Sequence, residues 1–240
     1  MDIIIHPEYA SLDHFIRKIP ACFAQTGTSI YKGRNELRVF DAGGEKLAVK
    51  SFKIPHIINR VAYSFFRKSK AKRSYENALE IIRRGFNTPQ PVACIEEFKH
   101  GLLHRSYYVC KFCDYERSFR EFTYYKVSFE GKEDILTAFA GFTARLQNAG
   151  IYHKDYSPGN ILFTKNAGGI DFCLVDINRV KFGYVGEKAG YKNFERIWGG
   201  DEMFAVIAER YASDRGFDVG KSVATLLHYN HKVMVPPKKK

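Results

Sequence analysis

Residues 152–163 read YHKDYSPGNILF and constrain the fold more than any other stretch of the chain. They place His153, Asp155 and Asn160 in an H-x-D-x-x-x-x-N frame, followed by the apolar run ILF. A second acid, Asp176, ends the strand-like run FCLV further along. Phosphoryl transfer uses a carboxylate beside the attacking hydroxyl, and an Asn and a second Asp for metal ions. The order of these residues therefore predicts the catalytic loop of a kinase-like fold.

The flanking segments divide into a β-rich half and a helical half. Strands are predicted at residues 28–34, 36–42, 46–52, 91–98 and 105–112, with a hairpin turn at AGGE and one helix from about Lys70 to Arg84. After residue 130, helical periodicity predicts a helix up to Gly150, a hairpin of NILF with FCLVDI, and further helices. We expect an α+β, bilobal, protein-kinase-like fold. A nucleotide-binding lobe would span residues 1–112, and a small, mostly helical lobe with the catalytic loop, metal site and acceptor site would span 113–240.

Three residues of the second half are candidates for chemistry. Asp155 is predicted to orient the acceptor hydroxyl and to take its proton late in the reaction. Asn160 and Asp176 offer hard oxygen ligands for Mg²⁺ bound to ATP. Asp171, in the sequence DFC, is an alternative, but it lies beside the predicted turn, whereas Asp176 follows an apolar strand. His153 is expected to organise the loop by hydrogen bonding.

A lysine and a glutamate of the first half are candidates for anchoring the ATP phosphates. Lys50 is a charge on the otherwise apolar strand LAVKSF, which fits the strand lysine of kinases. Its carboxylate partner is expected on the following helix. Glu76 and Glu80 lie one helical turn apart there, and Glu76 is preferred because it is further from the helix C-terminus.

The remaining nucleotide contacts are less clearly marked. The run YKGRN has only Gly33 where kinases have a glycine-rich loop, although one glycine permits a tight turn whose N–H groups face phosphate. Lys32 and Arg34 either add charge there or are solvated. Backbone groups near Lys111–Cys113 are expected to hold adenine, from their position in the chain.

Composition narrows the partners. A net charge of +12 favours an anionic partner, although it could also serve only solubility. A nucleic acid is not expected because no recognised module is present. Of the five cysteines, Cys110 and Cys113 form C-x-x-C, but without a second pair and on a predicted strand they are expected to be structural. No apolar run of membrane-spanning length and no secretory signal are seen, so a cytoplasmic location is expected.

The chain resembles the lipopolysaccharide kinase family, the Kdo and heptose kinases of the lipopolysaccharide core, from about Ile30 to Phe217. The motifs that carry the resemblance are IYKGRNELRVF, LAVKSFK, RKSKAKRSYENA with GFNTPQP, HKDYSPGNILF and VDINRVKFG. It implies ATP-dependent phosphorylation of a hydroxyl of Kdo or heptose, on a lipopolysaccharide core or lipid A–Kdo precursor at the inner face of the inner membrane. It also implies the base role for Asp155, the metal roles for Asn160 and Asp176, and the phosphate-anchoring pair Lys50 and Glu76.

Departures from protein kinases leave alternatives open. Asn178 stands where many protein kinases have the glycine of D-F-G, and no A-P-E follows, which favours a carbohydrate or small-molecule acceptor over a protein. Another acceptor, or an inactive kinase-like scaffold, are the competing hypotheses. In residues 60–73, Tyr63, Phe65 and Phe66 stand among six cations. This segment either contacts an anionic membrane surface or turns its aromatic side chains into the core.

Overall fold

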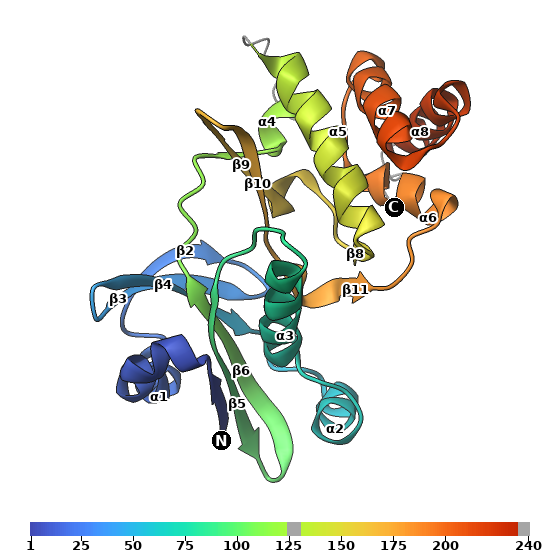
Figure 1. Ribbon diagram of the computed structural model, residues 1–240. Helices are drawn as coiled ribbons and strands as arrows, with labels where there is room; N and C mark the ends of the chain where they lie inside the picture. Colours follow the sequence, from blue (N-terminus) through green and yellow to red (C-terminus); the bar gives the residue numbers. More distant parts are fainter. Residues whose placement is uncertain (124–130, 235–240) are drawn as a thin grey trace. The chain divides into compact units, whose positions relative to one another are not determined.

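The computed structural model describes residues 1–123 and 131–234, and the chain forms two compact units, Met1–Asp114 and Tyr115–Lys240 (Figure 1). The expected division, after residue 112, falls close to this boundary. The separate roles assigned to the two units remain predictions. Among the described residues, no helix combines the length and apolar character needed to cross a bilayer.

The first unit is built on a six-stranded antiparallel sheet. Its strands lie in the order β1-β5-β6-β4-β3-β2, with bounds Asp2–Ile5, Pro91–Lys99, Leu102–Lys111, Glu45–Phe52, Glu36–Ala42 and Thr28–Lys32. The five strands expected from the sequence are confirmed. Strand β1 was not predicted, and it adds to the edge of the sheet by pairing with β5.

Two helices cover opposite faces of this sheet (Figure 1). Helix α1 (Asp13–Cys22), which follows the 3-10 turn η1 (Pro7–Leu12), buries Ile16 and Ile19 against Leu47 and Val49 of β4. Because side chains alternate across a strand, Lys50 lies on the other face, the one that α3 (Lys70–Arg83) contacts. The alternation of β4 therefore turns Lys50 away from the apolar core.

Helix α3 begins and ends close to the predicted positions. Ser69 caps it by accepting a 3.0 Å hydrogen bond from the Lys72 N–H, and Gly85 follows its end with φ of 82°. A further helix, α2 (Ile57–Phe65), precedes it and was not predicted. Phe65 and Phe66 are 67% and 82% exposed. The alternative that these two rings turn into the core is therefore wrong.

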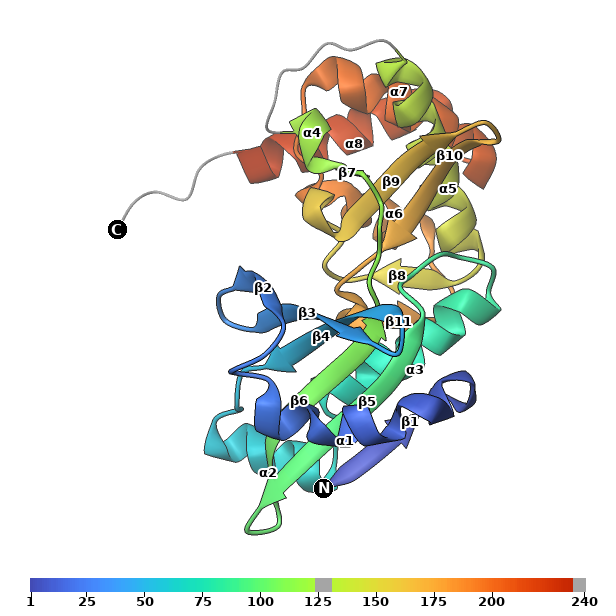
Figure 2. The same ribbon diagram turned by 90° about the vertical axis from the view of Figure 1, so that its left-hand side faces the viewer.

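The second unit packs α5 (Lys132–Asn148), α7 (Asp201–Arg215) and α8 (Val219–Met234) in succession beside a small sheet (Figure 2). The predicted hairpin is β9 (Ile161–Asn166) with β10 (Gly169–Leu174), and β7 (Arg117–Ser118) is a third strand. Strand β8 (Ile151–His153) pairs separately with β11 (Val180–Phe182). Short helices complete the unit: α4 (Arg120–Thr123), η2 (Pro158–Asn160), η3 (Ile177–Arg179), α6 (Glu187–Asn193) and η4 (Phe194–Arg196).

Aromatic side chains form the core of this second unit. The rings of Phe139 and Tyr156 are stacked with centroids 5.9 Å apart, and Phe194 meets both rings edge-on. The Tyr156 hydroxyl is hydrogen-bonded to Thr143 at 2.8 Å. Tyr156 lies within the H-x-D-x-x-x-x-N frame, so the loop is anchored from inside by one of its own side chains.

Candidate active site

A buried histidine organises the predicted catalytic loop of the second unit. The His153 side chain is fully buried, its Nδ1 accepts a 3.2 Å hydrogen bond from the Asp155 N–H, and its Nε2 lies 3.1 Å from the Val175 carbonyl. Since Nδ1 accepts, the proton must be on Nε2. Burial lowers the pKa of His153. A neutral histidine therefore ties the backbone at Asp155 to the backbone immediately before Asp176.

Asp155 is held by two arginines. Its Oδ1 accepts hydrogen bonds from Arg179 at 2.8 Å and from Arg196 at 2.9 Å, and the carboxylate is 18% exposed. Lys154 adjoins it, and the pKa of Lys154 is lowered chiefly by the charge of the nearby Lys181. Two arginines therefore share one oxygen of Asp155, Oδ1, and two lysines add positive charge to the same region.

The two predicted metal ligands belong to the same network as Asp155. Asn160 Nδ2 donates to the Asp155 carbonyl at 2.8 Å, which leaves Oδ1 as the amide atom that can bind a cation. The Asn160 carbonyl accepts from the Val175 N–H at 3.0 Å, next to Asp176. The structure therefore brings Asp155, Asn160 and Asp176 together through backbone contacts.

Asp176 has an unusual backbone conformation. Its φ of 55° and ψ of 45° are left-handed, and an aspartate there implies a constrained position of the kind found at functional sites. Asn178 Nδ2 donates to its Oδ1 at 2.7 Å, so the residue that replaces the glycine of D-F-G orients the acid. The alternative acid, Asp171, is exposed and accepts from Asn166 within the β9–β10 hairpin.

Lys50 of the first unit lies near the middle of the sheet. It is opposite Leu37 on β3 and Tyr108 on β6, and its ammonium is 5.5 Å from the centre of the Phe52 ring. An aromatic face attracts a cation without neutralising it. Lys50 is thereby supported on the α3 side of the sheet, and its role toward phosphate remains a prediction.

The two candidate carboxylates of α3 are both engaged in ion pairs. Glu80 accepts from Arg83 and Arg84, and these hydrogen bonds lower its pKa to about 2. Glu76 accepts from Lys68 at 2.7 Å, with about a third of its side chain exposed. A single, half-exposed lysine is easier to exchange than two arginines. The preference for Glu76 over Glu80 agrees with this arrangement, and the pairing of Glu76 with Lys50 remains a prediction.

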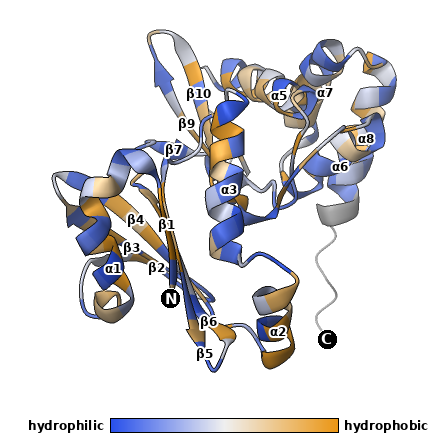
Figure 3. Cartoon of the chain, turned by 60° about the horizontal axis from the view of Figure 1, so that its bottom comes forward, coloured by the Kyte–Doolittle hydropathy of each residue, from blue (hydrophilic) through white to orange (hydrophobic). Residues whose placement is uncertain are grey.

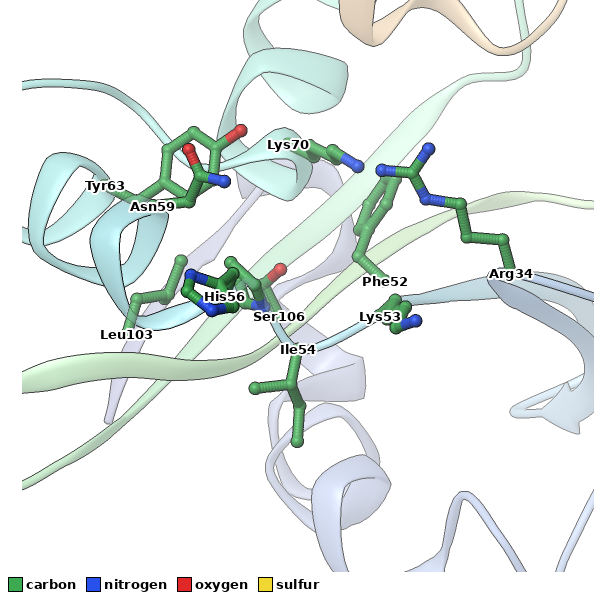
Figure 4. A pocket seen from close by; sticks show the side chains of 11 residues that line it. Arg34, Phe52, Lys53, Ile54, His56, Asn59, Tyr63, Lys70, Leu103 and Ser106 are labelled. Carbon is green, nitrogen blue, oxygen red and sulfur yellow. The ribbon is translucent and has the colours of Figure 1, made fainter.

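Gly33 lies in the turn between β2 and β3, where its N–H donates to the Asn35 carbonyl at 3.0 Å. Its neighbour Arg34 lines a cavity of about 310 Å³ under α2 (Figure 4). In this view Arg34 and Lys70 extend toward each other on either side of Phe52. The cavity lining contains four basic and no acidic residues: Arg34, Lys53, His56, Phe52, Ile54, Pro55, Asn59, Tyr63, Lys70, Leu103 and Ser106. Such a lining suits an anion.

The segment predicted to hold adenine follows β6. The Lys111 N–H donates to the Gln90 carbonyl and the Phe112 N–H to the Lys46 carbonyl, at 2.9 and 2.8 Å, while the Lys111 ammonium pairs with Glu45. These donors already serve the fold of the unit. The role of Lys111–Cys113 toward adenine remains a prediction.

The cysteines are consistent with a structural role. All five have free thiols, and burial raises the pKa of Cys110 to about 12, which suppresses thiolate chemistry. Among residues 1–123 and 131–234, no cluster of three or more His, Cys, Asp or Glu side chains is placed to hold a metal ion.

Sequence reasoning missed the residues that hold Asp155 and His153 in place. Arg179 belongs to the motif VDINRVKFG, but its target was not evident. Arg196 is 41 positions from Asp155, and Asn193, which donates to the His153 carbonyl at 2.9 Å, is 40 positions from His153. Arg196 and Asn193 lie in or beside η4, far along the sequence from the loop, so only folding brings them to it.

The fold of the chain is similar to that of a solved structure. The structure of WaaP in complex with acyl carrier protein matches with a TM-score of 0.65 at 13% identity, covering 98% of this chain and 100% of that chain. The Rio2 kinase–ADP/Mg²⁺–phosphoaspartate complex of Chaetomium thermophilum (TM-score 0.48, 17% identity) covers 91% of this chain and 67% of that one. The MAP kinase LmaMPK10 of Leishmania major (TM-score 0.46, 18% identity) covers 95% and 68%.

At the level of sequence, no curated protein matches the chain. The model of the lipopolysaccharide kinase (Kdo/WaaP) family matches residues 33–200, which include the predicted catalytic loop, Asp176 and Lys50. The α+β, protein-kinase-like fold expected from the sequence is confirmed. The chain belongs to the lipopolysaccharide kinase (Kdo/WaaP) family, and it is a kinase that phosphorylates a hydroxyl of the lipopolysaccharide core.

Proposed function

We propose that Asp155 is the residue that receives the acceptor hydroxyl, with ATP as the phosphoryl donor. The observation that carries this proposal is the pair of hydrogen bonds from Arg179 and Arg196 to one oxygen, Oδ1. They hold the carboxylate through one oxygen, so that the other oxygen, Oδ2, would receive the acceptor hydroxyl. Positioning of this kind accounts for much of the catalysis of phosphoryl transfer.

Asn160 and Asp176 are proposed to hold Mg²⁺. The donor set fits a hard cation, because both residues offer oxygen atoms and Asp176 is kept in a constrained backbone conformation. When bound, Mg²⁺ would neutralise charge on the ATP phosphates. Lys50 and Glu76, with the Gly33 turn, are proposed to contact those phosphates.

The acceptor is proposed to be an anionic sugar, Kdo or a heptose that bears or adjoins a charged group. Lys154, Arg179, Lys181 and Arg196 leave an excess of positive charge around Asp155. A sugar carboxylate or a neighbouring phosphate would be attracted to these cations. We further propose that the enzyme acts at the inner face of the inner membrane, where such glycolipid precursors are made.

The test compares Asp155→Asn with Asp171→Asn, an exposed acid in the same unit. Both variants are incubated with ATP, Mg²⁺ and purified lipid A–core precursors, and mass spectrometry locates the added phosphate. We expect Asp155→Asn to lower kcat by about 10²- to 10⁴-fold and Asp171→Asn to retain activity. Equal activity of the two variants would refute the assignment. The mass of the phosphorylated fragment identifies the sugar.

A further inference from the structure

Helix α2 exposes its large apolar side chains, whereas an ordinary surface helix buries them. Two of its polar side chains are bonded to the sheet: Arg60 donates to the Leu103 carbonyl of β6 at 2.8 Å, and Ser64 accepts from the Leu103 N–H at 2.8 Å. Its large apolar side chains face solvent instead. Their exposed fractions are 49% for Ile57, 74% for Ile58, 39% for Val61, 67% for Phe65 and 82% for Phe66. We call these five residues the α2 stripe.

The α2 stripe is continuous along the helix. Residues 57, 58, 61 and 65 recur at helical spacing on one side, and Phe66 follows at the end of the helix. Figure 3 shows α2 as a largely apolar helix at the surface of the first unit. Because the hydrogen bonds of Arg60 and Ser64 hold the opposite side on β6, the stripe cannot turn inward without breaking them. A contiguous exposed apolar surface of this kind marks an interaction site.

The surroundings of the α2 stripe identify an anionic partner. The sequence from residue 51 to 75 contains no Asp or Glu, while it contains seven Lys or Arg residues. Lys53, Arg67 and Lys68 are exposed, and α2 lines the basic cavity in Figure 4 with Asn59 and Tyr63, which are not part of the stripe. Glu76, the first acid that follows in the sequence, is paired with Lys68.

We propose that the α2 stripe is a docking surface for an anionic lipid bilayer. The apolar side chains would enter the boundary between headgroups and acyl chains, and the flanking cations would bind lipid phosphates. This inference deepens the proposed function, because it supplies the means by which the kinase reaches an acceptor anchored in a membrane. A second copy of the chain is disfavoured as occupant, since pairing two such surfaces would bring like charges together.

Sedimentation of the full chain with vesicles tests the proposal. Vesicles of phosphatidylglycerol mixed with phosphatidylcholine are compared with vesicles of phosphatidylcholine alone, without ATP or acceptor. We expect binding to the anionic vesicles. The double variant Ile58→Ser/Phe65→Ser should weaken it at least about tenfold. The matched control is Tyr184→Ser/Val219→Ser, which removes exposed apolar side chains (96% and 42%) from the second unit and should bind like the parent chain.

A second pair of variants tests the role of charge. Lys53→Gln/Arg67→Gln should weaken binding to anionic vesicles by about tenfold, whereas Lys188→Gln/Lys192→Gln, on α6, should have little effect. As a measurement that needs no substitution, hydrogen exchange of residues 57–66 should slow when anionic vesicles are added to the parent chain.

Three outcomes would overturn the proposal. The first is that the α2 stripe variant and the parent chain bind vesicles equally. The second is that hydrogen exchange in residues 57–66 does not change when vesicles are added. The third is that the parent chain dimerises without lipid and the stripe variant does not. Failure of the proposed function is recognised separately. The parent chain and the stripe variant should phosphorylate a water-soluble, deacylated core acceptor equally. If neither protein phosphorylates this acceptor, the proposed function is wrong, and the result of the vesicle experiment is unaffected.

Discussion

His153 is hydrogen-bonded to the backbone at both Asp155 and Val175, which precedes Asp176. Its replacement gives the sharpest test of how the candidate site is held together. Alanine at this position would leave the Val175 carbonyl and the Asp155 N–H without their partner inside the unit. Each orphaned buried group costs about 1–3 kcal/mol, and the cavity adds roughly 1–2 kcal/mol. Together the two orphaned groups and the cavity give an expected loss of about 3–8 kcal/mol in the free energy of unfolding of the second unit.

The same histidine gives a pH dependence of known sign. Burial lowers its pKa in the folded chain below the ordinary value of 6.5. The unfolded chain therefore binds more protons at acid pH, and the stability supplied by neutral His153 is complete above about pH 6.5 and is lost as the pH falls below it. The limiting slope is about 1.4 kcal/mol per pH unit.

Urea unfolding of the full chain between pH 5 and 8 measures both effects, with the tyrosine and tryptophan fluorescence as signal. His153→Gln is the informative variant, because its amide keeps an N–H donor for the Val175 carbonyl and does not titrate near neutral pH. We expect the parent chain to lose stability toward pH 5 more steeply than this variant does. His231→Gln, at an exposed histidine, controls for the substitution itself.

Parallel pH profiles of the parent chain and His153→Gln would show that His153 is not a buried neutral group, and the reasoning would fail. In the phosphotransfer assay, we expect His153→Ala to lower kcat by about 10²-fold with little change in KM for ATP, because Asp155 loses its position. An unchanged kcat would separate stability from catalysis and contradict the organising role of the histidine.

Two further predictions concern the contacts of the loop. Arg179→Gln and Arg196→Gln should each lower kcat/KM by roughly three- to tenfold, because the other arginine can still hold Asp155. In the double variant, the fall in kcat/KM should exceed the product of the two single effects. A fall equal to that product would contradict shared positioning. Gly159→Ala should cost about 1 kcal/mol in urea unfolding, because its Cβ would overlap the Arg120 guanidinium, while Gly168→Ala, which meets only ordinary contacts, should cost less; equal costs would exclude this clash.

Much of the fold was predictable because its signals are local. Alternating apolar residues and tight turns indicated the five strands. Ser69 and Gly85 mark the two ends of α3 close to the predicted positions. Strand β1 and helix α2 were missed for physical reasons. Strand β1 has only four residues, too few to show a clear periodicity. Helix α2 has an apolar side that faces away from the core, whereas an apolar side is normally expected to face the core.

The candidate site divides in the same way. The spacing within HKDYSPGN determined that Asp155 and Asn160 share one loop, since a few residues of chain keep them within reach of a hydrogen bond. The partner of Glu76 was not determined by spacing, because a long charged side chain pairs with whichever cation the packing presents, and here that cation is Lys68.

The amino-acid sequence by itself indicated the order of the main elements and the family, and it predicted the catalytic loop. Only the tertiary structure decided that Arg179 and Arg196 hold Asp155, that Asn178 orients Asp176, and that the apolar side of α2 faces outward. The reason is physical. Backbone propensity and short-range spacing act between neighbours in the chain, whereas ion pairs and burial depend on segments that only packing brings together.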